Sequence, residues 1–99
     1  MKKKFASTLR KGFHLTFENG LTASVQWGYG NYCDNRFNCE LGKDVQSDTA
    51  EVAVFKGRDF VSLKDFIPNC PDDIVCGYLT PEQVVKFLLE VMTANPDSI

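Results

Sequence analysis

The residues best suited to chemistry gather in one stretch, WGYGNYCDNRFNC, which runs from residue 27 to residue 39. Aromatic rings can stack on a ligand, amides and a carboxylate can hydrogen-bond with it, and a guanidinium can pair with a carboxylate or a phosphate. The candidate binding residues are therefore Trp27, Tyr29, Asn31, Tyr32, Asp34, Asn35 and Arg36. The same composition also suits a loop that caps the core, in which asparagines bond to nearby backbone. Both interpretations stay open at this point.

Two kinds of partner fit such a stretch. Stacking aromatics beside an arginine suit a nucleotide-like ligand. Tyrosine, tryptophan and arginine are also the residues enriched in the hot spots of protein interfaces. The sequence therefore predicts a binding site for a protein or for a small anionic ligand.

Four cysteines form two pairs with the same spacing, Cys33-x5-Cys39 and Cys70-x5-Cys76. Structural zinc sites mostly use two to four intervening residues, because a tight knuckle brings both sulfurs to one ion. Buried free thiols are therefore the expectation, with no metal and no cofactor. A zinc-stabilised structural or nucleic-acid-associated module that uses all four cysteines is the first alternative. Disulfides, which a reducing cytoplasm disfavours, are the other.

A catalytic interpretation depends on the only histidine, His14. A cysteine hydrolase would need His14 as the base for Cys33, oriented by Asp34 or Asn35. The spacing of these residues does not require them to meet. We therefore predict a protein that is not an enzyme, without catalytic residues.

The charges are divided unevenly along the chain. The net charge is -2, but the first eleven residues carry five basic and no acidic side chains. The remaining six basic and thirteen acidic side chains give -7, which argues against a broad nucleic-acid surface. No apolar run is long enough to span a membrane or to serve as a secretory signal. We expect a cytoplasmic protein that does not bind membranes.

The elements that must position these residues form one domain over residues 1–99. The chain reads as a basic segment (1–11), a hairpin (12–27), the candidate binding loop (28–48), a second hairpin (49–63), a loop (64–79) and a helix (80–93). The predicted fold is α+β: an antiparallel sheet of about four strands, built from two hairpins, with the C-terminal helix packed on one face. An exposed strand edge leaves room for a homodimer.

In the first hairpin, alternation places Phe13, Leu15 and Phe17 on one face. A two-residue turn at Asn19-Gly20 would put the apolar residues of the two strands on opposite faces. A three-residue loop, residues 18–20, corrects this register, with Gly20 in the left-handed conformation of a bulge. We therefore predict the pairs Phe17 with Leu21, Leu15 with Ala23 and Phe13 with Val25.

In the second hairpin, a turn at Gly57-Arg58 predicts several cross-strand pairs. They are Val54 with Val61, Val52 with Leu63, Phe55 with Phe60, Lys56 with Asp59 and Glu51 with Lys64. Phe55 and Phe60 would adjoin the binding loop or cover a second surface.

The helix has clear signals at its start. Thr80, Pro81 and Gln83 form a capping box with proline at the first helical position. Seven apolar residues follow at helical spacing and predict a well-buried helix that ends near residue 93. They are Val84, Val85, Phe87, Leu88, Leu89, Val91 and Met92.

The block KGFHLTFENGLTASVQWGYGNYCDNR, followed by SDTAEVAVF, resembles a group of small uncharacterised proteins of bacteriophages and their prophage relatives. This resemblance implies a phage accessory protein in the cytoplasm of a host cell. Such proteins often bind a host enzyme or sequester a nucleotide signal of antiviral defence. On these grounds we expect a non-catalytic binding protein that acts through the loop from Trp27 to Arg36 on a host protein or a small nucleotide-like ligand.

Overall fold

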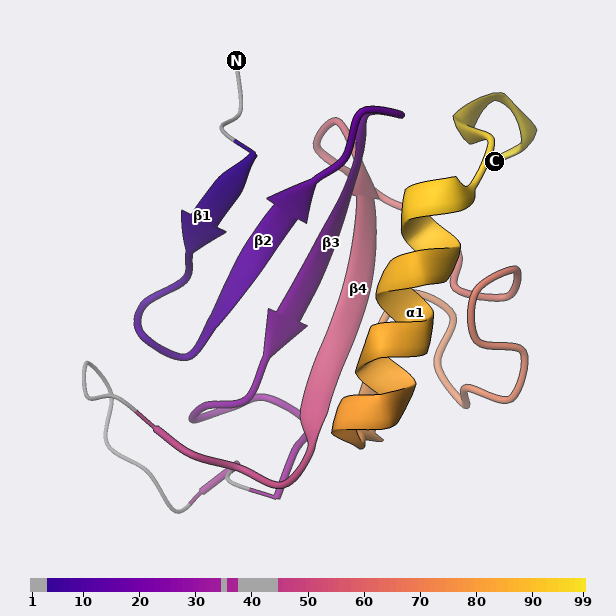
Figure 1. Cartoon of the computed structure of the whole chain (residues 1–99). Helices are drawn as coiled ribbons and strands as arrows, with labels where there is room; N and C mark the ends of the chain where they lie inside the picture. Colours follow the sequence, from indigo (N-terminus) through magenta and orange to yellow (C-terminus); the bar gives the residue numbers. More distant parts are fainter. Residues whose placement is uncertain (1–3, 35, 38–44) are drawn as a thin grey trace.

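The computed structural model describes residues 4–34, 36–37 and 45–99. These residues form a sheet and one long helix (Figure 1). The strands are β1 (Phe5–Ser7), β2 (Gly12–Thr16), β3 (Leu21–Gln26), β4 (Ala50–Lys56), β5 (Asp59–Phe60) and β6 (Cys76–Leu79). The helix α1 spans Pro81–Thr93, and a short 3₁₀ helix, η1, spans Pro96–Ser98.

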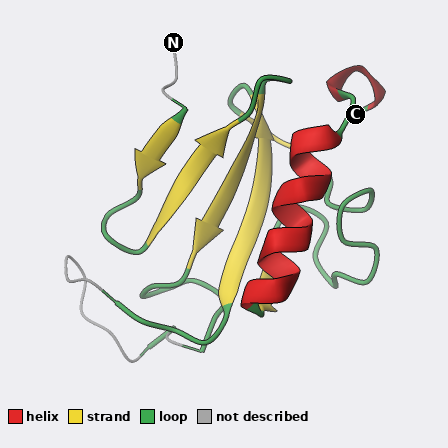
Figure 2. Ribbon diagram, in the orientation of Figure 1, coloured by secondary structure: helices red, strands yellow, loops and turns green. Residues whose placement is uncertain are grey.

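Neighbouring strands of the sheet are antiparallel throughout, in the order β1-β2-β3-β4. Both β5 and β6 pair with β4, at opposite ends of that strand. The α+β class and the C-terminal helix are confirmed, with α1 lying across one face of the sheet (Figure 2). The prediction of about four strands was too low, because the described residues form six.

The first hairpin has the predicted bulged register. Phe13 pairs with Val25 and Leu15 with Ala23. The Phe17 amide donates to the carbonyl of Leu21, and Gly20 has φ +88°. A residue with a Cβ is strained in that conformation, so the turn depends on glycine. This turn keeps the apolar residues of β2 and β3 on the same face of the sheet.

The second hairpin is shorter than predicted. Phe55 pairs with Phe60 and Lys56 with Asp59, and the Val61 amide still donates to the carbonyl of Val54. The predicted pairs Val52 with Leu63 and Glu51 with Lys64 are wrong.

The chain leaves the sheet after residue 61, and β6 takes the place beside β4, with Cys76 opposite Val52. The prediction of a loop over residues 64–79 missed this four-residue strand. Its pairing partner lies more than twenty residues away in sequence, so no local pattern indicated it.

The basic segment also contains a strand that the sequence did not predict. In β1, Phe5 pairs with Leu15 and Ser7 with Phe13. The turn back to β2 passes through Leu9 and Arg10, which both have positive φ. Three residues are too few to show a periodic pattern of apolar side chains. This strand is therefore defined by its pairing with β2 and not by its local sequence.

The helix begins as predicted. The Thr80 hydroxyl accepts from the Gln83 amide, and the Gln83 side chain accepts from the Thr80 amide at 2.8 Å. The prediction of a well-buried helix was wrong, because only Phe87 and Val91 are fully buried. Val85, Leu89 and Met92 are exposed. A single sheet face covers only one side of a helix, and no second layer of described elements lies over α1.

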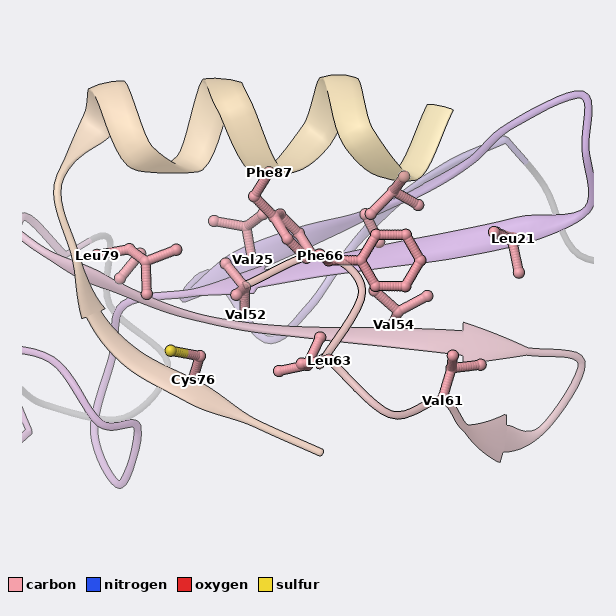
Figure 3. Packing of buried hydrophobic residues seen from close by; sticks show 13 residues of the cluster. Leu21, Val25, Val52, Val54, Val61, Leu63, Phe66, Cys76, Leu79 and Phe87 are labelled. Carbon is pink, nitrogen blue, oxygen red and sulfur yellow. The ribbon is translucent and has the colours of Figure 1, made fainter. Parts of the chain in front are cut away.

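The core lies between the sheet and α1, with Phe87 reaching down from the helix onto the strands (Figure 3). Leu63 and Phe66, from the segment that follows β5, pack into the same cluster. At the C-terminal end of α1, the Asn19 amide group donates to the carbonyls of Val91 and Ala94 at 2.9 and 3.0 Å. The turn between β2 and β3 thus satisfies carbonyls that the end of a helix leaves unpaired.

Candidate functional site

Trp27 lies apart from the rest of the predicted binding residues. It continues the alternation of β3, so its ring is on the face covered by α1, where it meets Phe13 edge-on at 6.0 Å. Its indole N–H donates to the carbonyl of Val45 at 3.1 Å. The ring is half-buried and its only donor is satisfied, so Trp27 acts in packing on the helix side.

Asn31 organises the loop that follows. It is buried; its carbonyl oxygen accepts from the Gly28 amide, and its NH₂ group donates to Glu51, both at 3.1 Å. The second carboxylate oxygen of Glu51 accepts from the Tyr32 amide at 3.1 Å. Asn31 is one of the predicted ligand-binding residues, and in the structure its side chain anchors the loop to β4.

Two further contacts tie the loop to the sheet. The Tyr32 carbonyl accepts from the Tyr78 amide of β6 at 2.9 Å. A Cβ at Gly77 would collide with Tyr32, so this approach requires glycine. The Asp34 amide donates to the Thr49 hydroxyl at 2.9 Å, while the Asp34 side chain is exposed. The backbone of the loop is therefore held on both flanks.

Four side chains gather on the outer surface of this anchored loop: Tyr29, Tyr32, Arg36 and Phe37. We call them the aromatic–arginine cluster. The Arg36 guanidinium carbon lies 4.3 Å from the ring centre of Tyr32 and 4.9 Å from that of Phe37. The rings of Tyr29 and Phe37 meet edge-on at 6.5 Å. Three of the predicted residues are thus brought together on one surface.

Phe37 is the member of the cluster that the sequence prediction missed. It is 70% exposed, more than either tyrosine. Its position directly after Arg36 in an aromatic-rich stretch was the available signal. Asn35, also predicted to bind, lies outside the described residues.

The charge of the cluster comes from Arg36. In the part of the chain that the structure describes, its Nε is buried without a hydrogen-bond partner. Within the same residues, the only ion pair joins Lys4 to Glu18. The guanidinium is therefore positioned by stacking on aromatic rings and has no carboxylate partner there.

The cysteines differ from the prediction. Cys70 and Cys76 form a disulfide, with their Cα atoms 5.7 Å apart, so the expectation of free thiols is wrong for this pair. The loop between them turns back on itself and brings the two Cα atoms within bonding range. Cys33 is a buried free thiol, as expected, and its sulfur contacts the Gly28 carbonyl.

The disulfide also bears on the zinc alternative. Sulfurs joined to each other are not available as thiolate ligands, so Cys70 and Cys76 cannot hold zinc in this form. Cys39 lies outside the described residues. Over the described ranges, no three His, Cys, Asp or Glu residues are grouped as a metal site would require.

His14 and Cys33 have separate surroundings. The His14 ring lies 5.8 Å from the ring of Phe55, which in turn lies 4.6 Å from Phe60. Phe55 alternates with the core residues Val52 and Val54 in β4, so these rings are on the sheet face away from α1. Phe55 and Phe60 therefore cover a second surface, which was one of the two alternatives predicted for them.

A groove and a smaller hollow adjoin the described part of the loop on different sides. An apolar groove of about 530 Å³ lies between α1 and the β2–β3 side of the sheet, with Trp27 in its wall. A smaller hollow of about 230 Å³ is lined by Tyr32, Tyr78 and the disulfide segment. Trp27 and Tyr32 therefore do not converge on one cleft.

Comparisons with protein-family models, with curated proteins and with solved structures find no match to this chain. Among the described residues, no helix is long and apolar enough to cross a membrane.

Proposed function

We propose that this protein is a non-catalytic binding module whose working surface is the aromatic–arginine cluster. The observation that carries this proposal is the stacking of the Arg36 guanidinium over the rings of both Tyr32 and Phe37, on a loop whose backbone is anchored to β4 and β6. An anchored loop loses little conformational entropy on binding, so more of the contact energy remains as affinity.

A protein is the partner that the geometry favours over a small ligand. Three exposed rings around an arginine have the composition of an interface hot spot. The adjacent hollow, at about 230 Å³, falls below the usual range of about 300–1,000 Å³ for small-molecule pockets. The partner surface would provide a carboxylate for Arg36 and apolar area for the rings.

The resemblance to small bacteriophage proteins adds the proposed setting. The partner would be a host protein in the cytoplasm, and binding would block its action. This part of the proposal is an analogy of class, since function resides in sites and not in folds.

The test compares two double variants as bait in host-cell extract. Tyr32→Ala with Arg36→Ala removes the cluster, while Arg58→Ala with Phe60→Ala removes an exposed arginine and an exposed ring elsewhere. We expect a protein retained by the wild type and the second variant, and lost from the first. The retained protein is then purified and its affinity measured by calorimetry.

Equal retention by both variants would refute the proposal. The same holds if the first variant loses binding only in proportion to its loss of folded protein, measured by circular dichroism. A panel of nucleoside mono-, di- and triphosphates tests the small-ligand alternative. A rise in melting temperature that depends on Arg36 would put a nucleotide in place of the protein partner.

A further inference from the structure

The outer side of α1 carries an unpartnered apolar ridge. Val85, Leu89 and Met92 are 66%, 55% and 48% exposed. Their spacing of four and then three residues aligns them along the helix, away from the buried Phe87 and Val91. Single exposed apolar residues are ordinary, whereas a contiguous row of three is a surface suited to contact with another molecule.

The apolar groove runs beside this ridge. Phe13 and Trp27 form the sheet side of the groove, and Val84, Val85 and Leu88 form its helix side. Val85 belongs to both features, so the ridge and the groove are one continuous apolar surface.

The opposite flank of the ridge is charged. Glu82, Lys86 and Glu90 follow at four-residue spacing, which lines them up along α1 with alternating sign. None of them forms an ion pair within the described residues, where Lys4 and Glu18 make the only one. These charges are therefore available to a partner that packs on the ridge.

We propose that α1 is the interface of a homodimer, in which the helices of two copies pack antiparallel about a twofold axis near Leu89. Such an interface is isologous, so each flank of the ridge meets the same flank of the second copy. Lys86 then lies next to Glu90 of the second copy, and the twofold axis repeats the pair. The groove sides of the two copies then lie next to each other.

The charge pattern selects this arrangement over a parallel one. In parallel helices related by a twofold axis, opposite flanks of the ridge would meet. Lys86 would then face the groove of the second copy, where Asp48 is the one charged residue among the described residues that line it. Burial of the ammonium group among the largely apolar remainder of the groove is costly. The antiparallel arrangement pairs unlike charges and joins apolar surface to apolar surface.

This dimer uses none of the four residues of the aromatic–arginine cluster, so it goes beyond the proposed binding function and does not depend on it. A dimer would carry the cluster twice. A partner with two copies of its own epitope would then be bound with added avidity.

Sedimentation velocity over a wide range of protein concentration tests the proposal. We expect a monomer–dimer equilibrium for the wild type and a monomer at every concentration for Leu89→Glu. Leu89 is more than half exposed, so this variant should fold, and circular dichroism of both proteins at low concentration checks it.

A charge swap tests the orientation of the helices. Lys86→Glu places Glu against Glu90 of the second copy, and we expect the dissociation constant to rise on the order of tenfold. Adding Glu90→Lys to the same chain restores opposite charges and should restore the dimer. Lys64→Glu, at another exposed lysine, is the matched control and should change nothing.

A wild type that stays monomeric at all concentrations would overturn the dimer, and so would a dimer that survives Leu89→Glu. A dimer that Leu89→Glu breaks but Lys86→Glu leaves unchanged would overturn the antiparallel arrangement. Failure of the double swap to restore association would also do so.

Discussion

Trp27 and Tyr32 are five residues apart, yet they belong to different surfaces. Trp27 continues β3, packs against Phe13 under α1 and has its N–H satisfied. Tyr32 lies past the turn at Gly28, faces outward and stacks on Arg36. The difference shows that residues of one aromatic-rich stretch are divided between the helix side of the sheet and an outward-facing surface according to where the strand ends.

The largest expected effect on stability is at Trp27, the residue of this pair that packs on the helix side of the sheet. Trp27→Ala removes a half-buried ring from the helix side of the sheet and should lower the free energy of unfolding by about 3 kcal/mol, at the low end for large aromatic residues. Urea denaturation followed by circular dichroism measures it. Partner binding per folded molecule should stay unchanged, and a selective loss of binding would instead return Trp27 to the binding surface.

The next largest effect on stability is expected at Asn31, which connects the start of the loop to β4. Asn31→Ala leaves the Gly28 amide and the Glu51 carboxylate without their partner, so the free energy of unfolding should fall by about 1–3 kcal/mol. We also expect faster amide exchange at Tyr32 by NMR, because Glu51 accepts from that amide. If the exchange rate of Tyr32 stays at the wild-type value, Asn31 does not anchor the loop.

A smaller effect on stability is expected at Tyr32 and Arg36, which face outward. Tyr32→Ala with Arg36→Ala should lower the free energy of unfolding by less than about 1 kcal/mol, because exposed cation–π contacts contribute little. Thermal unfolding measures it, with the Arg58→Ala and Phe60→Ala variant as control. A collapse of stability as large as that of Trp27→Ala would show that the cluster is part of the core.

The smallest effect is at the surface ion pair. The hydrogen bond from Lys4, 2.6 Å long, lowers the pKa of Glu18 and raises that of Lys4. The stabilisation from Glu18 is therefore present above the pKa of this carboxyl in the unfolded chain. It is lost as the pH falls through the lowered pKa of the folded protein.

An NMR titration of the Glu18 carboxyl should show its pKa rise in the Lys4→Met variant. Because both groups are fully exposed, unfolding curves at neutral pH should barely change. An unchanged pKa would mean that the pair does not form in solution.

Local patterns in the sequence determined the first hairpin and the helix start. The register of Phe13 with Val25 follows from alternation plus the positive φ that Gly20 accepts, and both are properties of adjacent residues. The capping box of Thr80 and Gln83 is equally local. The gathering of Tyr32 and Arg36 on one surface agrees with the composition of the stretch, although their contact with Phe37 was not foreseen.

Tertiary structure alone decided the remaining features. Whether Asn31 bonds to Glu51 or to a ligand depends on where β4 lies. Whether Cys76 pairs with Cys70 depends on β6, a strand that forms by pairing with β4. The exposed ridge of α1 exists because one sheet covers one side of the helix. Each of these depends on contacts between distant residues, for which the local sequence carries no periodic signal.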